Sequence, residues 1–257
     1  MSAYRLDLAY DGTDFHGYAR QPNVRTVQRE LEEALVHHAG MVETIVAGRT
    51  DAGVHASGQV VSFTTRRDLD VDRVLRSLNS QLAEEIAVTA LRLVEDDFHA
   101  RFSAVSRAYR YQIVNRFVHD PLRARYSWHV KAPLDLEAMN EATAVLVGEH
   151  DFASFCRKAE GVGTVRKVLW AGWNVTGDTT EFSIAAESFC HQMVRSLVAV
   201  LVLVGRSRMP ASEIKAILAA GDRNRARGTA PPQGLTLVGV GYPGEPLEPP
   251  VWVTSAS

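Results

Sequence analysis

The residue types best suited to chemistry stand together in the stretch AGRTDAGVHASGQVVSF, residues 47–63. Arg49, Thr50 and Asp51 are consecutive there and are flanked by glycines. An ionised aspartate can act as a nucleophile or a general base, and the nearby Arg49 would hold it ionised and oriented. An Asp beside glycine is most often only a turn former. Both interpretations of Asp51 stay open on these residues alone.

A second candidate region is FHARFSAVSRAYRYQIVNRFVHDPLRARY, residues 98–126. Six arginines and one acidic residue, Asp120, lie between positions 101 and 125, with aromatic side chains interleaved. Arginines contact phosphates and aromatics stack on bases, which is the combination used in RNA recognition. The competing interpretation is a solvated strand face with core aromatics on the other side.

A third candidate is Arg195 in SFCHQMVRSLVAVL, near the start of a helix that is otherwise apolar. A guanidinium there either extends to the surface or is partly buried and needs a partner, for which Asp51 is the obvious candidate. The histidines do not fall at metal-ligand spacings, and by their neighbours His55 and His191 are the two that best fit a site lining.

Composition narrows the classes of protein. The 257 residues carry a net charge of -2, so any basic surface must be local, as in the clusters CRKAEGVGTVRK and GDRNRARG. Cys156 and Cys190 are too few for a disulfide framework, so a reducing compartment is expected. The N-terminus does not resemble a signal peptide, and the longest apolar run, residues 197–205, is too short to span a membrane.

Hydrophobic periodicity predicts the elements that position these residues. Helices are expected over 26–38, 70–82, 135–147, 190–205 and 211–220. Strands are expected over 4–11, 43–48, 58–65, 86–94, 108–115, 166–177, 180–188 and 235–242. The mixture lacks regular βαβ alternation, so the sequence predicts an α+β fold. We expect two similar halves, 1–100 and 101–242, followed by a loose tail over 243–257.

The stretch AGRTDAGVHASGQVVSF strongly resembles the signature loop of the tRNA pseudouridine synthase A family. Further blocks follow in the family's order: AYDGTDFHGYARQPNVRTVQRELEEAL, DDFHARFSAVSRAYRYQI, GEHDFASFC, SFCHQMVRSLV and TAPPQGLTLVGVGY. The resemblance covers residues 4–242. It implies a pseudouridine synthase fold, with a shared, mostly antiparallel central sheet, helices on one face and a basic cleft between the halves.

The resemblance also implies an activity. Members isomerise uridine to pseudouridine at positions 38, 39 and 40 of the tRNA anticodon stem and loop, in the cytoplasm, as homodimers, without cofactor or metal. By motif, Asp51 is the nucleophile, Tyr109 stacks on the target uracil and is a possible base, and Arg195 pairs with Asp51. The expected substrate contacts also include Arg49, His55, Phe98, His99, Ala100, Arg101, Phe102, Arg107, Arg110, Arg157 and Lys158.

Two blocks depart from the family pattern. Tyr18 and Ala19 stand where the family has Trp and Gln, and Ala83 and Glu85 replace Pro and Asp. These departures concern the grip on tRNA rather than the three catalytic positions.

Two alternatives remain beside the isomerase. One is a catalytically silent tRNA-binding protein of the same fold, against which the presence of Asp51, Tyr109 and Arg195 argues. The other is a hydrolase or phosphotransferase with Asp51 as nucleophile, which would need a second acid or a metal cluster.

Overall fold

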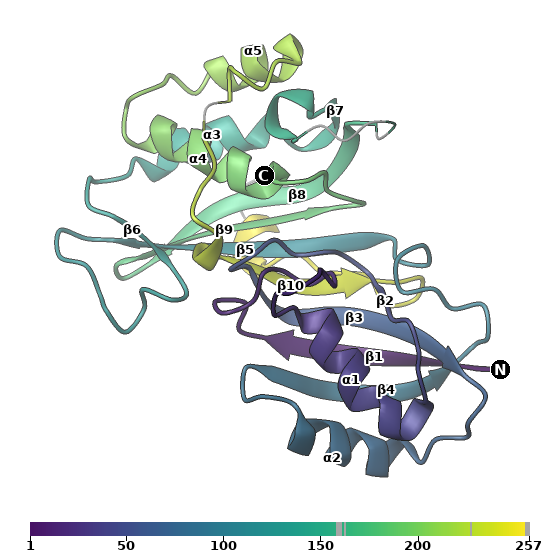
Figure 1. Ribbon diagram of the computed structural model, residues 1–257. Helices are drawn as coiled ribbons and strands as arrows, with labels where there is room; N and C mark the ends of the chain where they lie inside the picture. Colours follow the sequence, from purple (N-terminus) through teal and green to yellow (C-terminus); the bar gives the residue numbers. More distant parts are fainter. Residues whose placement is uncertain (158–160, 162, 227, 255–257) are drawn as a thin grey trace. The chain divides into compact units, whose positions relative to one another are not determined.

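The computed structural model describes residues 1–157, 161, 163–226 and 228–254 (Figure 1). Its contacts divide the chain into two units: residues 1–105 with 236–246, and residues 106–235 with the segment from 247 onward. The last strand of the expected C-terminal half therefore contributes mainly to the first unit. Each unit combines a mostly antiparallel sheet with helices, which confirms the predicted α+β fold.

The first unit is built on four neighbouring strands. Their order is β4 (Ile86–Val94), β1 (Ser2–Tyr10), β3 (His55–Thr65) and β10 (Leu235–Gly241), and the short β2 (Ile45–Val46) also pairs with β3. β1 runs antiparallel to both of its neighbours, whereas β10 is parallel to β3. The chain between β2 and β3 carries Asp51, so the sheet fixes both ends of that loop.

The core of this unit follows from the alternation of β1. Alternate residues from Tyr4 to Tyr10 are buried, as expected of a strand with one apolar face. Helix α1 (Val27–Ala39), which lies across the sheet in Figure 1, buries Leu31 and Leu35, and it contacts α2 (Val71–Gln81). Asp70 caps α2 by accepting from the Arg73 N–H at 3.0 Å.

The second unit is built on a further run of neighbouring strands. Its strands run in the order β5 (Ser106–Asn115), β9 (Thr179–Ala186), β8 (Val165–Thr176) and β7 (Gly148–Asp151). All these pairs are antiparallel, and the short β6 (Trp128–Val130) adds a parallel pair to β5. The antiparallel β8–β9 pair turns at Gly177, whose φ of 62° favours glycine.

Helix α4 (Met193–Gly205) explains the longest apolar run of the sequence. It is buried on nearly every side and packs against α3 (Leu136–Ala144). A Cβ at Gly205 would lie 2.4 Å from the Met139 sulfur, so the Met139 side chain would have to shift to admit a larger residue here. The third helix here is α5 (Glu213–Ala220). Among the described residues, no helix is both long and apolar enough to cross a membrane.

Several local features differ from the sequence expectations. The short strands β6 and β7 were not anticipated, because three or four residues carry too little periodicity. Helix α4 begins at Met193 rather than at 190, since Gln192 adopts φ 64° and interrupts the helical path. The expected tail contains a short helix, α6 (Val251–Thr254), which contacts β8. Two 3-10 turns, η1 (Ala153–Phe155) and η2 (Pro232–Gly234), were also not predicted.

Cys156 and Cys190 form a disulfide, whereas the sequence analysis expected no disulfide framework. Their Cα atoms lie 5.6 Å apart, within the usual range for a bridge. The two segments are held side by side because the Arg157 N–H donates to the His191 carbonyl at 2.9 Å. A separation of 34 positions hides this proximity in the sequence.

Candidate active site

Asp51 lies half-buried on the loop between β2 and β3. The loop turns tightly at this residue, because the Val54 N–H donates to the Asp51 carbonyl at 3.1 Å. Thr50 is buried and Arg49 is exposed. The aspartate is thus presented at a fixed turn, whereas the neighbouring arginine extends from the surface.

The side chains of Tyr10, Thr50 and Gln59 form a buried hydrogen-bond network, called the latch below, on the N-terminal side of Asp51. The hydroxyls of Tyr10 and Thr50 are 2.7 Å apart. The fully buried Gln59 amide donates to the Gly48 carbonyl at 2.7 Å and to the Tyr10 hydroxyl at 3.2 Å. Burial raises the pKa of Tyr10 to about 12, so this hydroxyl stays protonated at neutral pH.

The backbone of residues 12–18 holds the same loop from the other side. The Tyr18 N–H donates to the Thr50 carbonyl at 3.1 Å, and the Gly53 N–H donates to the Phe15 carbonyl at 3.3 Å. A Cβ at Gly12 would lie 2.0 Å from the Val54 carbonyl oxygen, so the contact needs glycine. These contacts leave the Asp51 loop little freedom to move within the first unit.

The departures from the family pattern lie in this scaffold. Tyr18 is fully buried, and the Glu85 side chain accepts from the Arg25 guanidinium at 3.1 Å. The carbonyl of Ala83 accepts from the Ile86 N–H at 2.9 Å. His55 is also buried, and its Nδ1 accepts from the Gly12 N–H at 3.0 Å. Of the residues that depart from the family pattern, Tyr18 contacts the Asp51 loop directly, through its N–H to the Thr50 carbonyl.

Residues 98–103 form a compact turn in the first unit. His99 and Phe102 stack at 4.3 Å between ring centroids, and the Arg101 guanidinium lies 5.5 Å from the Phe102 ring. Phe102 is 76% exposed, which gives this turn an aromatic and a cation at the surface. Phe98 instead packs against the Tyr242 ring, and Ala100 is fully buried.

Tyr109 and Arg195 both belong to the second unit. Tyr109 lies on β5 and meets the Phe189 ring edge-on at 5.1 Å. Arg195, in the first turn of α4, donates from Nε to the Ala230 carbonyl at 2.8 Å, and its own carbonyl accepts from the Ala230 N–H at 2.9 Å.

Tyr111 connects these two residues. It follows Tyr109 by two positions, so both side chains leave the same face of β5. Its hydroxyl donates to the Pro231 carbonyl at 2.8 Å, beside the Ala230 contact of Arg195. Burial raises the pKa of Tyr111, and the charge of Arg195 opposes that shift. The second unit therefore gathers Arg195 and Tyr111 around residues 230–231, with Tyr109 on the same face of β5.

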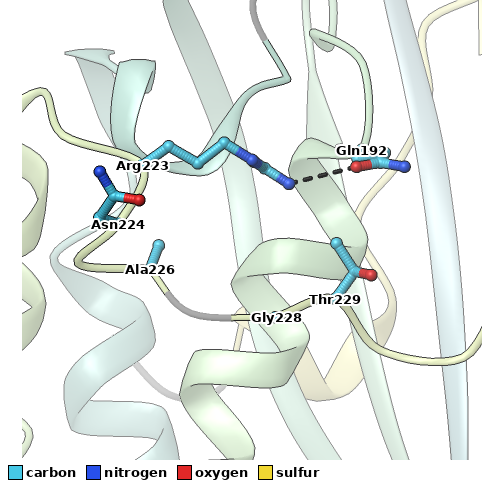
Figure 2. A pocket seen from close by; sticks show the side chains of 6 residues that line it. All are labelled: Gln192, Arg223, Asn224, Ala226, Gly228 and Thr229. Atoms are coloured by element: carbon cyan, nitrogen blue, oxygen red, sulfur yellow. Dashed lines mark hydrogen bonds between the residues drawn. The ribbon is translucent and has the colours of Figure 1, made fainter.

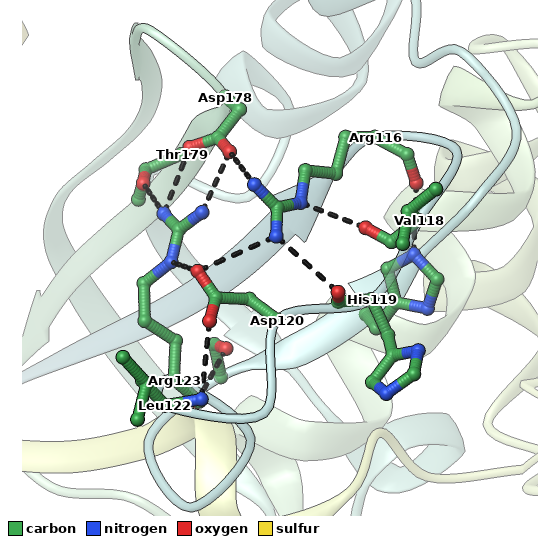
Figure 3. A network of polar contacts seen from close by, with 10 residues as sticks. Arg116, Val118, His119, Asp120, Leu122, Arg123, Asp178 and Thr179 are labelled. Atoms are coloured by element: carbon green, nitrogen blue, oxygen red, sulfur yellow. Dashed lines mark hydrogen bonds and ion pairs between the residues drawn. The ribbon is translucent and has the colours of Figure 1, made fainter.

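Four arginines of the region 98–126 have contacts within the second unit. Arg107 donates to the Glu187 carbonyl at 2.9 Å, and Arg110 lies 3.8 Å from the Glu181 carboxylate. Figure 3 shows Arg116 and Arg123 with Asp120 and Asp178 in one cluster.

Arg123 anchors the cluster in Figure 3. It contacts both carboxylate oxygens of Asp178, at 2.8 and 2.6 Å, and reaches Asp120 at 2.7 Å. Arg116 lies 3.3 Å from Asp178 and 3.5 Å from Asp120. Hydrogen bonds from Arg123 are the largest cause lowering the pKa of both carboxyls. Two cations and two carboxylates neutralise one another, so this part of the region is tied to the fold.

Arg157 is exposed, and Lys158 lies outside the described residues. Among the residues that the structure describes, no three His, Cys, Asp or Glu side chains gather closely enough to hold a metal ion. Sequence reasoning missed Tyr10, Gln59 and Gly12. Tyr10 and Gly12 belong to the short motif YDG, which is typical of an ordinary turn, and Gln59 lies within the stretch 47–63 with no signal of its own.

Comparison with known proteins places these features in context. Residues 8–103 and 142–243 match a family model described as tRNA pseudouridine synthase. The chain is 46% identical over 242 residues to tRNA pseudouridine synthase A of Halalkalibacterium halodurans, covering 91% of this chain and 90% of that protein. It is 44% identical to the protein of the same name from Syntrophotalea carbinolica, covering 94% and 97%. A solved structure titled dye-decolorizing protein from V. cholerae gives a TM-score of 0.21 at 16% identity, covering 93% and 91%.

Proposed function

Because this chain belongs to the tRNA pseudouridine synthase family, we propose that it isomerises uridine to pseudouridine at positions 38, 39 and 40 of the tRNA anticodon stem and loop. The observation that carries the proposal is the Asp51 turn, which is held between a buried latch and a glycine-rich backbone. A fixed carboxylate suits covalent catalysis, since orientation supplies a large part of the rate.

In the proposed reaction, the bond between ribose and uracil N1 breaks while Asp51 forms a covalent bond to the ribose or to the uracil. The base turns and rejoins the ribose through C5, the bond to Asp51 breaks so that its carboxylate is regenerated, and the C5 proton is released as N1 gains one. No electrons are lost or gained, so the reaction requires no redox partner. The target uridine must leave its stack, which costs a few kcal/mol.

Tyr109 and Arg195 complete the proposed site. We propose that Tyr109 stacks on the extruded uracil, at about 1–3 kcal/mol for such a contact, and it is the possible base for removal of a ribose proton. By the family resemblance, Arg195 is the proposed partner of Asp51; within the second unit, its Nε donates to the Ala230 carbonyl from the first turn of α4. The further proposed tRNA contacts, or residues that shape them, are Arg49, His55, Phe98, His99, Ala100, Arg101, Phe102, Arg107, Arg110, Arg157 and Lys158.

The test is release of tritium from tRNA labelled at uridine C5, followed by mapping of the modified positions. Modification confined to positions 38, 39 and 40 supports the proposal. Modification at other positions would contradict this choice of target uridines. Tight tRNA binding with no release would identify the alternative, a silent tRNA-binding protein of the same fold.

We further propose that the protein is a cytoplasmic homodimer. The tRNA substrate and the family membership support this assignment, and sedimentation equilibrium at micromolar concentration tests the dimer. A reducing cytoplasm requires that the Cys156–Cys190 bond can open without loss of function. Thiol counting and tritium release with and without dithiothreitol test that requirement, and loss of turnover on reduction would argue against it.

A further inference from the structure

A polar hollow of about 620 Å³ opens in the second unit, next to the start of α4 (Figure 2). It is lined by Gln192, Arg223, Asn224, Ala226, Gly228 and Thr229. This lining includes a cation and several hydrogen-bonding side chains, and none of the six residues is acidic or aromatic. Such a lining suits an anion rather than a stacked base.

Arg223 is the centre of this hollow. It donates to the Gln192 amide oxygen at 3.2 Å, as Figure 2 shows, and to the Ser196 hydroxyl at 3.3 Å. Both contacts are long and both acceptors are neutral. Within the described part of the chain, Arg223 contacts no carboxylate. A half-buried guanidinium with only neutral acceptors favours an anionic ligand.

The nearby acids are engaged elsewhere. Asp222 accepts from the backbone and side chain of Asn224 at 2.9 and 3.0 Å. Glu213 pairs with Arg225 at 2.5 Å. Arg223 and Arg225 therefore differ: Arg225 has a carboxylate partner, and Arg223 faces the hollow.

A second cation stands beside Arg223. Burial is the larger cause that lowers the pKa of Arg223, and the positive charge of Arg157 is the other. Arg157 is held near Gln192 because its N–H donates to the His191 carbonyl at 2.9 Å. Two neighbouring guanidiniums repel one another until an anion lies between them.

We propose that this hollow binds one backbone phosphate of the tRNA, with Arg223 and Arg157 as its cationic ligands. The inference rests on the proposed function, which supplies the polyanionic substrate. Guanidinium groups match phosphate in shape and charge. Since Gln192 and Ser196 flank Arg195, a phosphate held here would fix the RNA backbone beside the first turn of α4.

The test is the salt dependence of the tRNA dissociation constant for Arg223→Gln. One lost phosphate contact should weaken binding about tenfold near physiological salt and reduce the slope of log K against log[salt] by about 0.7–0.9. The matched control is Arg225→Gln, two positions away on the same loop, which should leave the slope unchanged. An equal effect of both variants, or an unchanged slope for Arg223→Gln, would overturn the proposal.

Two further variants separate charge from structure. Ser196→Ala removes a neutral tether of Arg223 and keeps its charge, so the salt slope should stay native. If this variant reproduced the loss, Arg223 would be a structural residue only. Arg157→Gln should lower the slope like Arg223→Gln, and the double variant should lose less than the sum, since both arginines bind one phosphate.

A competition experiment with inorganic phosphate distinguishes a backbone phosphate of tRNA from a free phosphate ion as the ligand of the hollow. At constant ionic strength, it should compete with tRNA for the native protein more than for Arg223→Gln. If inorganic phosphate bound the native protein but not Arg223→Gln, while the tRNA affinity of Arg223→Gln stayed native, the hollow would hold a free ion. That result would contradict the proposal. Tritium release by the native protein is a separate measurement. Its absence would refute the proposed isomerase and leave the phosphate site supported by the binding data.

Discussion

The Asp51 loop of the first unit and the arginine-rich region 98–126 both drew attention in the sequence, but the structure treats them differently. The loop is short, and its neighbours hold it through the Tyr10–Thr50 and Gln59–Gly48 contacts. In the longer region, Arg116 and Arg123 are neutralised by Asp120 and Asp178. The turn 98–103 of that region keeps an exposed aromatic, Phe102, beside Arg101.

The difference shows what each kind of sequence signal reports. A motif with fixed glycines indicates a backbone geometry that only certain residues permit. Gly12 is an example, because a Cβ there would clash with the Val54 carbonyl. A local excess of arginine reports only composition, because partners distant in sequence, such as Asp178, decide whether the charge is available. The arginine that best fits an anion site, Arg223, lies outside the region altogether.

The largest effect among the supporting residues is expected for Tyr109→Ala. Loss of a stacked base should lower turnover about 10- to 100-fold, with a smaller change in tRNA affinity. Single-turnover tritium release and tRNA binding measure the two separately. Tyr126→Ala, in the same region but beyond β5, serves as the control and should remain near native. A loss of affinity alone in Tyr109→Ala would make it an ordinary RNA contact.

Gln59→Leu should disturb the Asp51 loop without touching the RNA surface. It leaves the Gly48 carbonyl without the donor it has now, whereas the Tyr10 hydroxyl keeps its contact with Thr50. The orphaned carbonyl costs about 1–3 kcal/mol of stability, and a loosened nucleophile should cost turnover about tenfold. The readout is turnover against tRNA affinity, with Gln81→Leu on the exposed end of α2 as control. Equal losses in turnover and affinity would reduce Gln59 to a structural residue.

Tyr10→Phe should have a smaller effect in the same direction. It removes one hydroxyl from the latch and keeps the ring in the core, at a net cost of about 1 kcal/mol. The melting temperature and the turnover rate should both fall modestly, with tRNA affinity unchanged. A turnover loss larger than that of Gln59→Leu would show that the hydroxyl itself matters to the reaction.

Arg123→Gln should have the smallest effect on RNA, with no change in the salt slope of tRNA binding. Its cluster should instead appear in the pH dependence of stability. The carboxyls of Asp120 and Asp178 have lowered pKa values in the fold. Their contribution is therefore complete above the unfolded pKa of about 3.9 and is lost as pH falls through the folded values.

Melting temperature measured from pH 6 down to pH 2 checks that expectation. The native protein should lose more stability than Asp178→Asn over the acidic part of this range. Parallel curves for the two proteins would contradict the stabilising role of this cluster. A lower salt slope in Arg123→Gln would mean that Arg123 binds RNA, so that the arginines of region 98–126 are not neutralised as inferred.

Much of the fold could be predicted from the sequence, because long periodic segments such as 4–11 and 197–205 report a buried face directly. A turn at Asp51 could be predicted because glycines and strand patterns bracket it. Its role as nucleophile came from the family resemblance. Gln59 and Tyr10 could not be predicted as its latch, since their partners depend on strand register. The Cys156–Cys190 bond and the hollow at Arg223 depend on long-range chain contacts that one sequence does not encode visibly.

The most direct test of the central claim compares native protein with Asp51→Asn in tritium release from tRNA labelled at uridine C5, with EDTA present. Asparagine keeps the size of the side chain and removes the nucleophilic carboxylate. We expect release by the native protein, none by the variant, and similar tRNA affinity for both. Turnover by Asp51→Asn would remove Asp51 from the nucleophile role and contradict the account.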